Sequence, residues 1–130
     1  MPPFILIVED HQNLREMLTA ALTLHGYRIA QAADAREALL LLWQRASTGH
    51  APDLILLDLE MPDGVQFLEH LQGPWTIWPR PLLVLMTATG AAVSLPYPLL
   101  RKPFQIKDIL SVLHQLLSDS GKASGKVESQ

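Results

Sequence analysis

The chain has no cysteine, no excess of basic charge and no long hydrophobic run. Without cysteine it can form neither disulfides nor thiolate metal sites, which leaves the cellular compartment open. A formal net charge of −3 argues against direct binding to nucleic acid or to an anionic membrane. No apolar stretch reaches the roughly 20 residues of a membrane-spanning helix, and no basic segment precedes the first stretch as in a signal peptide. We therefore expect one cytoplasmic domain that does not associate with a membrane.

The apolar residues gather instead in short runs, at 4–8, 54–57 and 82–86, with a weaker run at 99–100. Continuous apolar runs of this length are typical of strands that are buried on both faces of a parallel sheet. Residues 27–31 alternate between polar and apolar types, which predicts a short strand near a sheet edge. The sequence thus predicts five strands.

Segments with helical spacing separate most of these strands. Apolar residues at intervals of three and four predict helices over about 12–25, from Asp34 onward, around 65–71 and over 106–117. The stripes are Leu14, Met17, Leu18, Ala21 and Leu22; Ala38, Leu39 and Leu42; Val65, Leu68 and Leu71; and Ile106, Ile109, Leu110, Leu113 and Leu117. Strands that alternate with helices in this way predict a doubly wound, three-layer α/β fold.

The turn after the first predicted strand contains no glycine and reads Glu-Asp-His-Gln-Asn over residues 9–13. Rossmann and P-loop folds need a glycine-rich turn there, because backbone amides must approach a phosphate closely. Two negative charges at this place would also repel a nucleotide phosphate. Both nucleotide-binding classes are therefore disfavoured.

Polar side chains follow the predicted strands: Glu9 and Asp10, Asp58, Thr87 and Lys102. The carboxyl ends of parallel strands meet at one edge of a sheet, so we expect these side chains to share one pocket. Carboxylates about 4 Å apart repel each other by roughly 4 kcal/mol at an effective dielectric constant near 20, and a cation would relieve this repulsion. Oxygen ligands favour a hard divalent ion, which predicts Mg²⁺ or Mn²⁺.

A carboxylate beside such an ion can accept a phosphoryl group, which makes Asp58 the candidate nucleophile. Lys102 would pair with one phosphoryl oxygen, and the hydroxyl of Thr87 would donate a hydrogen bond to another. Catalysis of this kind consists mainly of positioning and electrostatics. The sequence therefore predicts phosphoryl transfer to Asp58.

Four segments resemble, in order, the motifs of the response-regulator receiver domain of bacterial two-component signalling: Ile5–Asp10, Asp58–Gly64, Thr87–Ala88 and Lys102–Phe104. The resemblance covers about residues 4–117. It implies a flavodoxin-like three-layer sandwich with a five-stranded parallel sheet of order 2-1-3-4-5. We expect a receiver domain over 1–118 and a flexible tail, rich in Ser, Gly and Lys, over 119–130.

The resemblance also implies roles for individual residues. Asp10, Asp58 and the backbone carbonyl of Glu60 would bind Mg²⁺, with Glu9 helping through water. Ala88 would join Thr87 and Lys102 in binding the phosphoryl group, and the peptide bond before Pro103 would be cis. The phosphodonor would be a histidine kinase or a phosphotransfer protein. Acceptance and loss of the phosphoryl group would be self-catalysed, so the chain would not be an enzyme in the usual sense.

Two features depart from the family pattern. Lys102 follows Thr87 by 15 positions (102 − 87), fewer than the family normally has, and residues 91–98 carry two prolines and no apolar stripe. We therefore expect the fourth family helix to be shortened or missing. The position three before the lysine, usually an aromatic that switches with the threonine, is Leu99; Tyr97, two residues earlier, can point to the same face.

Two alternatives to a phosphorylation switch stay open. A shortened fourth helix suits a receiver-like module that binds proteins without being phosphorylated. Asp58-Leu59-Glu60 is also similar to the Asp-x-Asp pair of aspartate-nucleophile phosphatases, but those enzymes place the pair after the first strand, whereas here it follows the third predicted strand. Phosphatase activity is therefore the weaker alternative.

Overall fold

The computed structural model describes residues 1–73, 80–88 and 95–121. It has five strands: β1 (Phe4–Val8), β2 (Arg28–Ala32), β3 (Leu54–Asp58), β4 (Leu82–Thr87) and β5 (Leu99–Arg101). All neighbouring pairs are parallel, and the order across the sheet is β2-β1-β3-β4-β5. The predicted flavodoxin-like sheet is confirmed.

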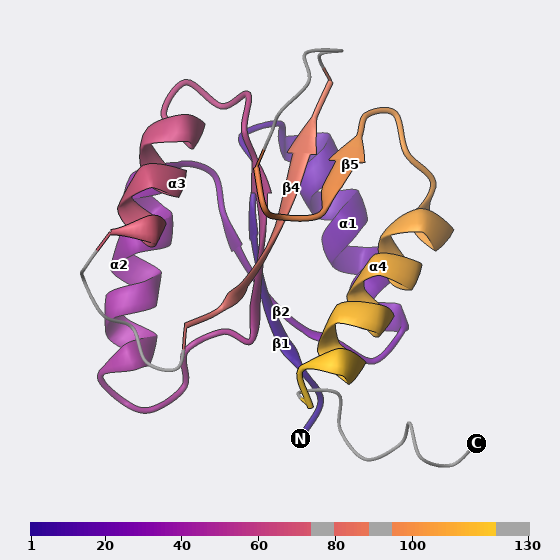
Figure 1. The fold of residues 1–130 in the computed structure, drawn as a ribbon, viewed down its shortest axis with the longest axis horizontal. Coiled ribbons are helices and arrows are strands. Elements are labelled where there is room, and N and C mark those ends of the chain that lie inside the picture. The colour runs from indigo at the N-terminus through magenta and orange to yellow at the C-terminus, as the bar shows by residue number, and fades with distance from the viewer. Residues whose placement is uncertain (74–79, 89–94, 122–130) are drawn as a thin grey trace.

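Within the described ranges, four helices cover the sheet: α1 (Gln12–Leu24), α2 (Ala35–Ala46), α3 (Gly64–Gln72) and α4 (Ile106–Asp119). Figure 1 shows α2 and α3 on one face and α1 and α4 on the other, which gives the three layers. The right-handed crossover expected of parallel strands explains why successive helices fall on these two faces.

Side chains alternate between two cores along each buried strand. Leu6 and Val8 of β1 pack in the core beneath α2 and α3, whereas Ile5 and Ile7 pack in the core beneath α1 and α4. All four side chains are fully buried. An uninterrupted apolar run is therefore what a strand covered on both faces requires.

Local signals in the sequence set the helix ends. Asp34 caps α2, because its Oδ1 accepts a hydrogen bond from the Glu37 amide at 2.8 Å. The Glu37 side chain in turn accepts from the amide of Ala33 at 2.6 Å. Gly26, just beyond α1, has a φ of 95°, a left-handed conformation that favours glycine. These contacts satisfy backbone groups that helix ends leave unpaired.

Several details differ from the sequence predictions. β2 begins one residue later than predicted, at Arg28, and α4 continues past 117 to Asp119. Val65 is 55% exposed and Phe67 is buried in its place, because the apolar face of α3 is rotated from the stripe predicted for it. Met17 is 43% exposed at the border of the α1 stripe.

Residues 88–98 connect β4 to β5. Of these, the described ones (88 and 95–98) form no helix, while 89–94 lie outside the described residues. The tryptophan-containing segment 74–79 and the predicted tail beyond 121 also lie outside the described part. None of the helices in the described ranges is long and apolar enough to span a bilayer.

Candidate functional site

The acidic residues predicted to converge do so at the carboxyl ends of β1 and β3. One carboxylate oxygen each from Glu9, Asp10 and Asp58 lies within 4.8 Å of the other two. Glu9 is fully buried and Asp58 is 3% exposed, whereas Asp10 is exposed. Adjacent pairing of β1 with β3 explains the convergence, because parallel strands end at the same edge.

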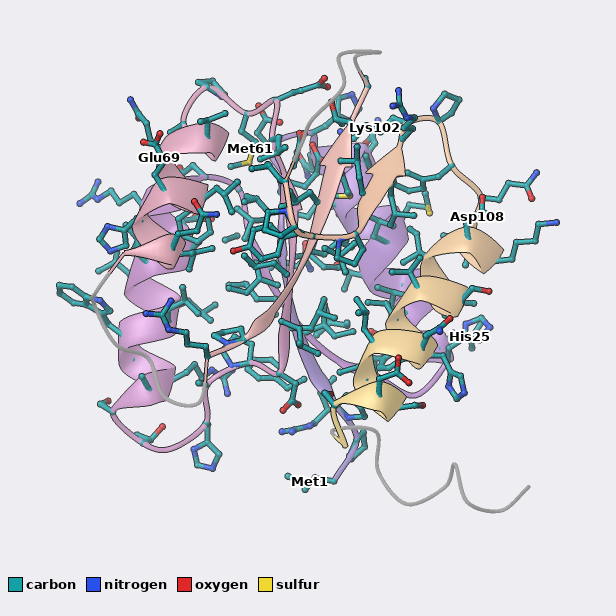
Figure 2. The ribbon with its side chains drawn as sticks, viewed as in Figure 1. Met1, His25, Met61, Glu69, Lys102 and Asp108 are labelled. Atoms are coloured by element: carbon teal, nitrogen blue, oxygen red, sulfur yellow. The ribbon has the colours of Figure 1, made fainter. Side chains whose placement is uncertain are left out.

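Lys102 reaches this acidic cluster from the residue after β5. Its Nζ lies 2.9 Å from Oε1 of Glu9 and 3.3 Å from Oδ2 of Asp58. The Lys102 amide donates to the Thr87 carbonyl at 2.7 Å, and the Lys102–Pro103 peptide bond is cis. Figure 2 places Lys102 at the edge of the sheet where β4 and β5 end, and Met61 lies near the same edge. One ammonium thus faces two buried carboxylates.

Burial controls the electrostatics of the cluster. Burial raises the pKa of Glu9, against the opposing effect of its hydrogen bonds from Lys102 and the His11 amide, and the neighbouring Asp58 raises this pKa further. For Lys102, burial opposes the charged form, but the hydrogen bond to Glu9 and the charge of Asp58 together raise its pKa above 10.5. Among the described residues of this cluster, three carboxylates thus lie near the single ammonium of Lys102.

The donor set fits a divalent cation. Three carboxylates offer oxygen ligands close together, and one of them is exposed, so that water can complete the coordination shell. Mg²⁺ prefers such oxygen ligands and usually keeps several waters. Glu9, Asp10 and Asp58 are thus the described residues that could hold the ion.

Thr87 and Ala88, predicted to bind a phosphoryl group, both donate to the side chain of Glu60. Thr87 Oγ1 lies 2.7 Å from Glu60 Oε2, and the Ala88 amide lies 2.8 Å from Glu60 Oε1. The resemblance predicts a backbone role at the metal for Glu60, and a side chain at the border of the pocket that influences how fast the phosphoryl group is lost, but it does not predict these two hydrogen bonds. The available signal was its place two residues after Asp58, just beyond the end of β3, the strand that pairs with β4.

Leu99 and Tyr97, the two candidates for the switch position, are both half-buried against the core beneath α2 and α3. The Tyr97 hydroxyl also lies 3.3 Å from Nε2 of Gln72, at the end of α3. Both side chains therefore point to the same face of the sheet, as their separation by two residues predicts.

The loop after Asp58 is tightly wound. Oδ1 of Asp58 accepts from the Glu60 amide at 2.9 Å, and the Leu59 amide donates to the Met86 carbonyl at 3.0 Å. Gly64 begins α3 directly against this loop. A Cβ at Gly64 would lie 2.6 Å from the Asp58 carbonyl oxygen and 2.9 Å from that of Leu59, so the site requires glycine here.

We expect Gly64→Ala to destabilise the protein by about 1–3 kcal/mol, as overpacking does in other proteins. Alanine has the higher helix propensity, by roughly 0.8–1 kcal/mol, but the clash is with backbone atoms that cannot move without displacing Asp58. Urea unfolding measures the effect, with the exposed Val65→Ala of the same helix as the control. Equal stability of the two variants would show that the loop is not held as tightly as its contacts indicate.

The family described as response regulator receiver domain matches residues 5–114 of this chain. The chain is 32% identical over 142 residues to the response regulator MprA of Mycolicibacterium vanbaalenii, in an alignment that covers 99% of this chain and 56% of the relative. It is 32% identical over 123 residues to the regulatory protein AtoC of Escherichia coli (strain K12), in an alignment that covers 87% of this chain and 25% of that protein. The chain thus spans about half, or less, of the length of these curated relatives.

Solved structures agree with this match. The receiver domain of the hybrid histidine kinase CckA has a TM-score of 0.72 and 28% identity, over 88% of this chain and 98% of that chain. The chemotaxis protein CheY4 of Vibrio cholerae has a TM-score of 0.71 and 25% identity, over 90% of this chain and 100% of that chain. Because the family match covers most of the chain and its acidic cluster, this chain belongs to the response regulator receiver domains of two-component signalling, which are signalling domains rather than conventional enzymes.

Proposed function

We propose that Asp58 accepts a phosphoryl group from a phosphohistidine of a histidine kinase or phosphotransfer protein. The observation that carries this proposal is the convergence of Glu9, Asp10 and Asp58 within 4.8 Å, with Lys102 in contact with two of them. A carboxylate oxygen of Asp58 forms a bond to phosphorus while the bond between phosphorus and the donor imidazole breaks. The acceptor is a residue of the chain itself, so the product is a modified protein.

The residues around Asp58 have complementary tasks in this proposal. A bound Mg²⁺ or Mn²⁺, held by Glu9, Asp10 and Asp58 with the backbone carbonyl of Glu60, would offset the negative charge of donor and product. Lys102, already within 3.3 Å of Asp58, would pair with a phosphoryl oxygen as a mobile point charge. Thr87 Oγ1 and the Ala88 amide would donate hydrogen bonds to other phosphoryl oxygens.

Phosphorylation would act as a switch of partner binding. It adds about −1.5 to −2 charges at neutral pH beside Thr87 and Lys102, and these side chains must rearrange around the new oxygens. Tyr97 and Leu99 lie on the segment just before Lys102, so this segment is placed to transmit the change. We assign the receiver domain to residues 1–118.

Intact-mass measurement tests the proposal. Incubation with acetyl phosphate or phosphoramidate and Mg²⁺ should add one phosphoryl group per chain, and chelation of the metal should prevent it. If the chain gains no phosphoryl group from small donors or from phosphorylated histidine kinases, the proposal is wrong. Partner binding by such an unmodified chain would instead support the alternative of a module that works without phosphorylation.

A further inference from the structure

The Glu60 carboxylate occupies the two hydrogen-bond donors at the end of β4. Each of its oxygens takes one donor: Oε2 accepts from Thr87 Oγ1 at 2.7 Å and Oε1 accepts from the Ala88 amide at 2.8 Å. Both distances lie in the range of charge-assisted hydrogen bonds. Two anionic oxygens bound to a hydroxyl and an amide are also what a phosphoryl group would present there.

The contact is held in place by the loop that carries it. The Glu60 amide donates to Asp58 Oδ1 at 2.9 Å, so the residue that bears the carboxylate is fixed next to the phosphoacceptor. Thr87 is 2% exposed, which leaves its hydroxyl little access to water. Because the Glu60 carboxylate is tethered next to Thr87 and Ala88, its effective concentration at these two donors is high.

Lys102 is engaged in the same manner, by Glu9 at 2.9 Å and Asp58 at 3.3 Å. Each group that would bind phosphoryl oxygens is thus already bound to a carboxylate of this chain. The Ala88 amide has one hydrogen to donate, so Glu60 and a phosphoryl oxygen cannot both have it.

We propose that the Glu60 side chain is an internal competitor of the phosphoryl group: its carboxylate binds Thr87 and Ala88 in the unphosphorylated protein and must leave before they can bind phosphoryl oxygens. This inference rests on the proposed function and adds a regulatory contact to it. The contact engages the Thr87 hydroxyl in the resting state, and it lowers the apparent affinity for an incoming anion in proportion to the fraction of molecules in which the contact is open.

The first test uses the unphosphorylated protein. Ala88 is exposed, so the hydrogen bond to Glu60 protects its amide from exchange with solvent. In Glu60→Ala we expect the Ala88 amide to exchange at least about tenfold faster, as measured by NMR. The buried amide of Leu85 in β4, which donates to the carbonyl of Pro98 just before β5, serves as an internal reference for intact folding. Unchanged Ala88 protection, with Leu85 protected in both proteins, would overturn the inference.

The second test measures competition directly. Beryllofluoride with Mg²⁺ serves as the phosphoryl mimic, and we expect Glu60→Ala to bind it about tenfold more tightly than the native chain does, a change of roughly 1.4 kcal/mol. Glu60→Asp keeps the charge but shortens the side chain by one methylene, so it should also bind more tightly. Glu69→Ala removes an exposed carboxylate of α3 and should bind like the native chain.

The outcomes separate this inference from the proposed function. If Glu60→Asp and the native chain bind equally and only Glu60→Ala gains affinity, charge rather than the contact is responsible and the inference fails. If no variant binds the mimic or accepts a phosphoryl group, the proposed function fails, while the exchange of Ala88 still decides whether Glu60 holds the two donors.

Discussion

Asparagine in place of Asp58 is expected to abolish the phosphoryl adduct altogether. The carboxamide is neutral and a far poorer nucleophile than a carboxylate, whereas its size is almost the same. Its carbonyl oxygen can still accept the hydrogen bond from the Glu60 amide, so the loop should keep its geometry. Intact mass after incubation with acetyl phosphate and Mg²⁺ measures the effect.

The matched control removes a carboxylate that lies away from the cluster. Glu69 is exposed on α3, and Glu69→Gln changes the net charge as Asp58→Asn does. We expect the control to be phosphorylated like the native chain. An adduct that persists in Asp58→Asn at native levels would show that another residue is the acceptor.

Lys102→Met should have the largest effect on stability among substitutions at the site. It leaves Glu9, which is fully buried, and Asp58, which is 3% exposed, without the ammonium that both contact. Removal of one partner from a buried ion pair typically costs about 3–5 kcal/mol, because the remaining charge stays in a poorly solvated place. The cost measured by urea unfolding should fall in this range or below it, since the Lys102 side chain is 20% exposed.

The effect should depend on pH in a defined direction. The pKa of Glu9 is raised in the folded state, so its contribution to stability is present below the unfolded pKa and is lost as pH rises through the folded value. Loss of Lys102 raises this pKa further. The difference in free energy of unfolding between the native chain and Lys102→Met should therefore be small near about pH 4, close to the ordinary pKa of a glutamate, and should grow as pH rises toward about pH 7.

Lys107→Met, on the exposed side of α4, is the control for loss of a lysine. It should unfold like the native chain at both pH values. Mg²⁺ should restore part of the stability lost in Lys102→Met, because the ion supplies positive charge at the same carboxylates. A stability loss that is equal for the two lysine variants, or independent of pH, would contradict the electrostatic account of the cluster.

The sheet and the acidic cluster could be predicted because each depends on local patterns and on one rule of topology. Runs such as Phe4–Val8 are apolar throughout since both faces of their strands are covered, and their ends meet because the strands are parallel. Glu9, Asp10 and Asp58 come together for that reason alone. No long-range packing detail was needed to place them.

Other features depended on packing that the sequence does not record. The periodicity of a nine-residue helix such as α3 does not fix its rotation about its own axis. Val65, which was predicted to face the core, is therefore exposed, and Phe67 is buried instead. The bridge from Glu60 to Thr87 and Ala88 depends on the register that pairs Asp58 with Met86, and on the path of the loop after β3. A strand-end motif locates Glu60 but does not say where its side chain points.

Calorimetric titration with Mg²⁺ tests most directly whether Glu9, Asp10 and Asp58 form one cation site. We expect one ion per chain, with affinity at least about tenfold weaker in Asp10→Asn, because that substitution removes a charged ligand and the exposed side chain is not part of the core. Absence of any heat of binding at millimolar Mg²⁺, or the same affinity in Asp10→Asn as in the native chain, would contradict this account of the site.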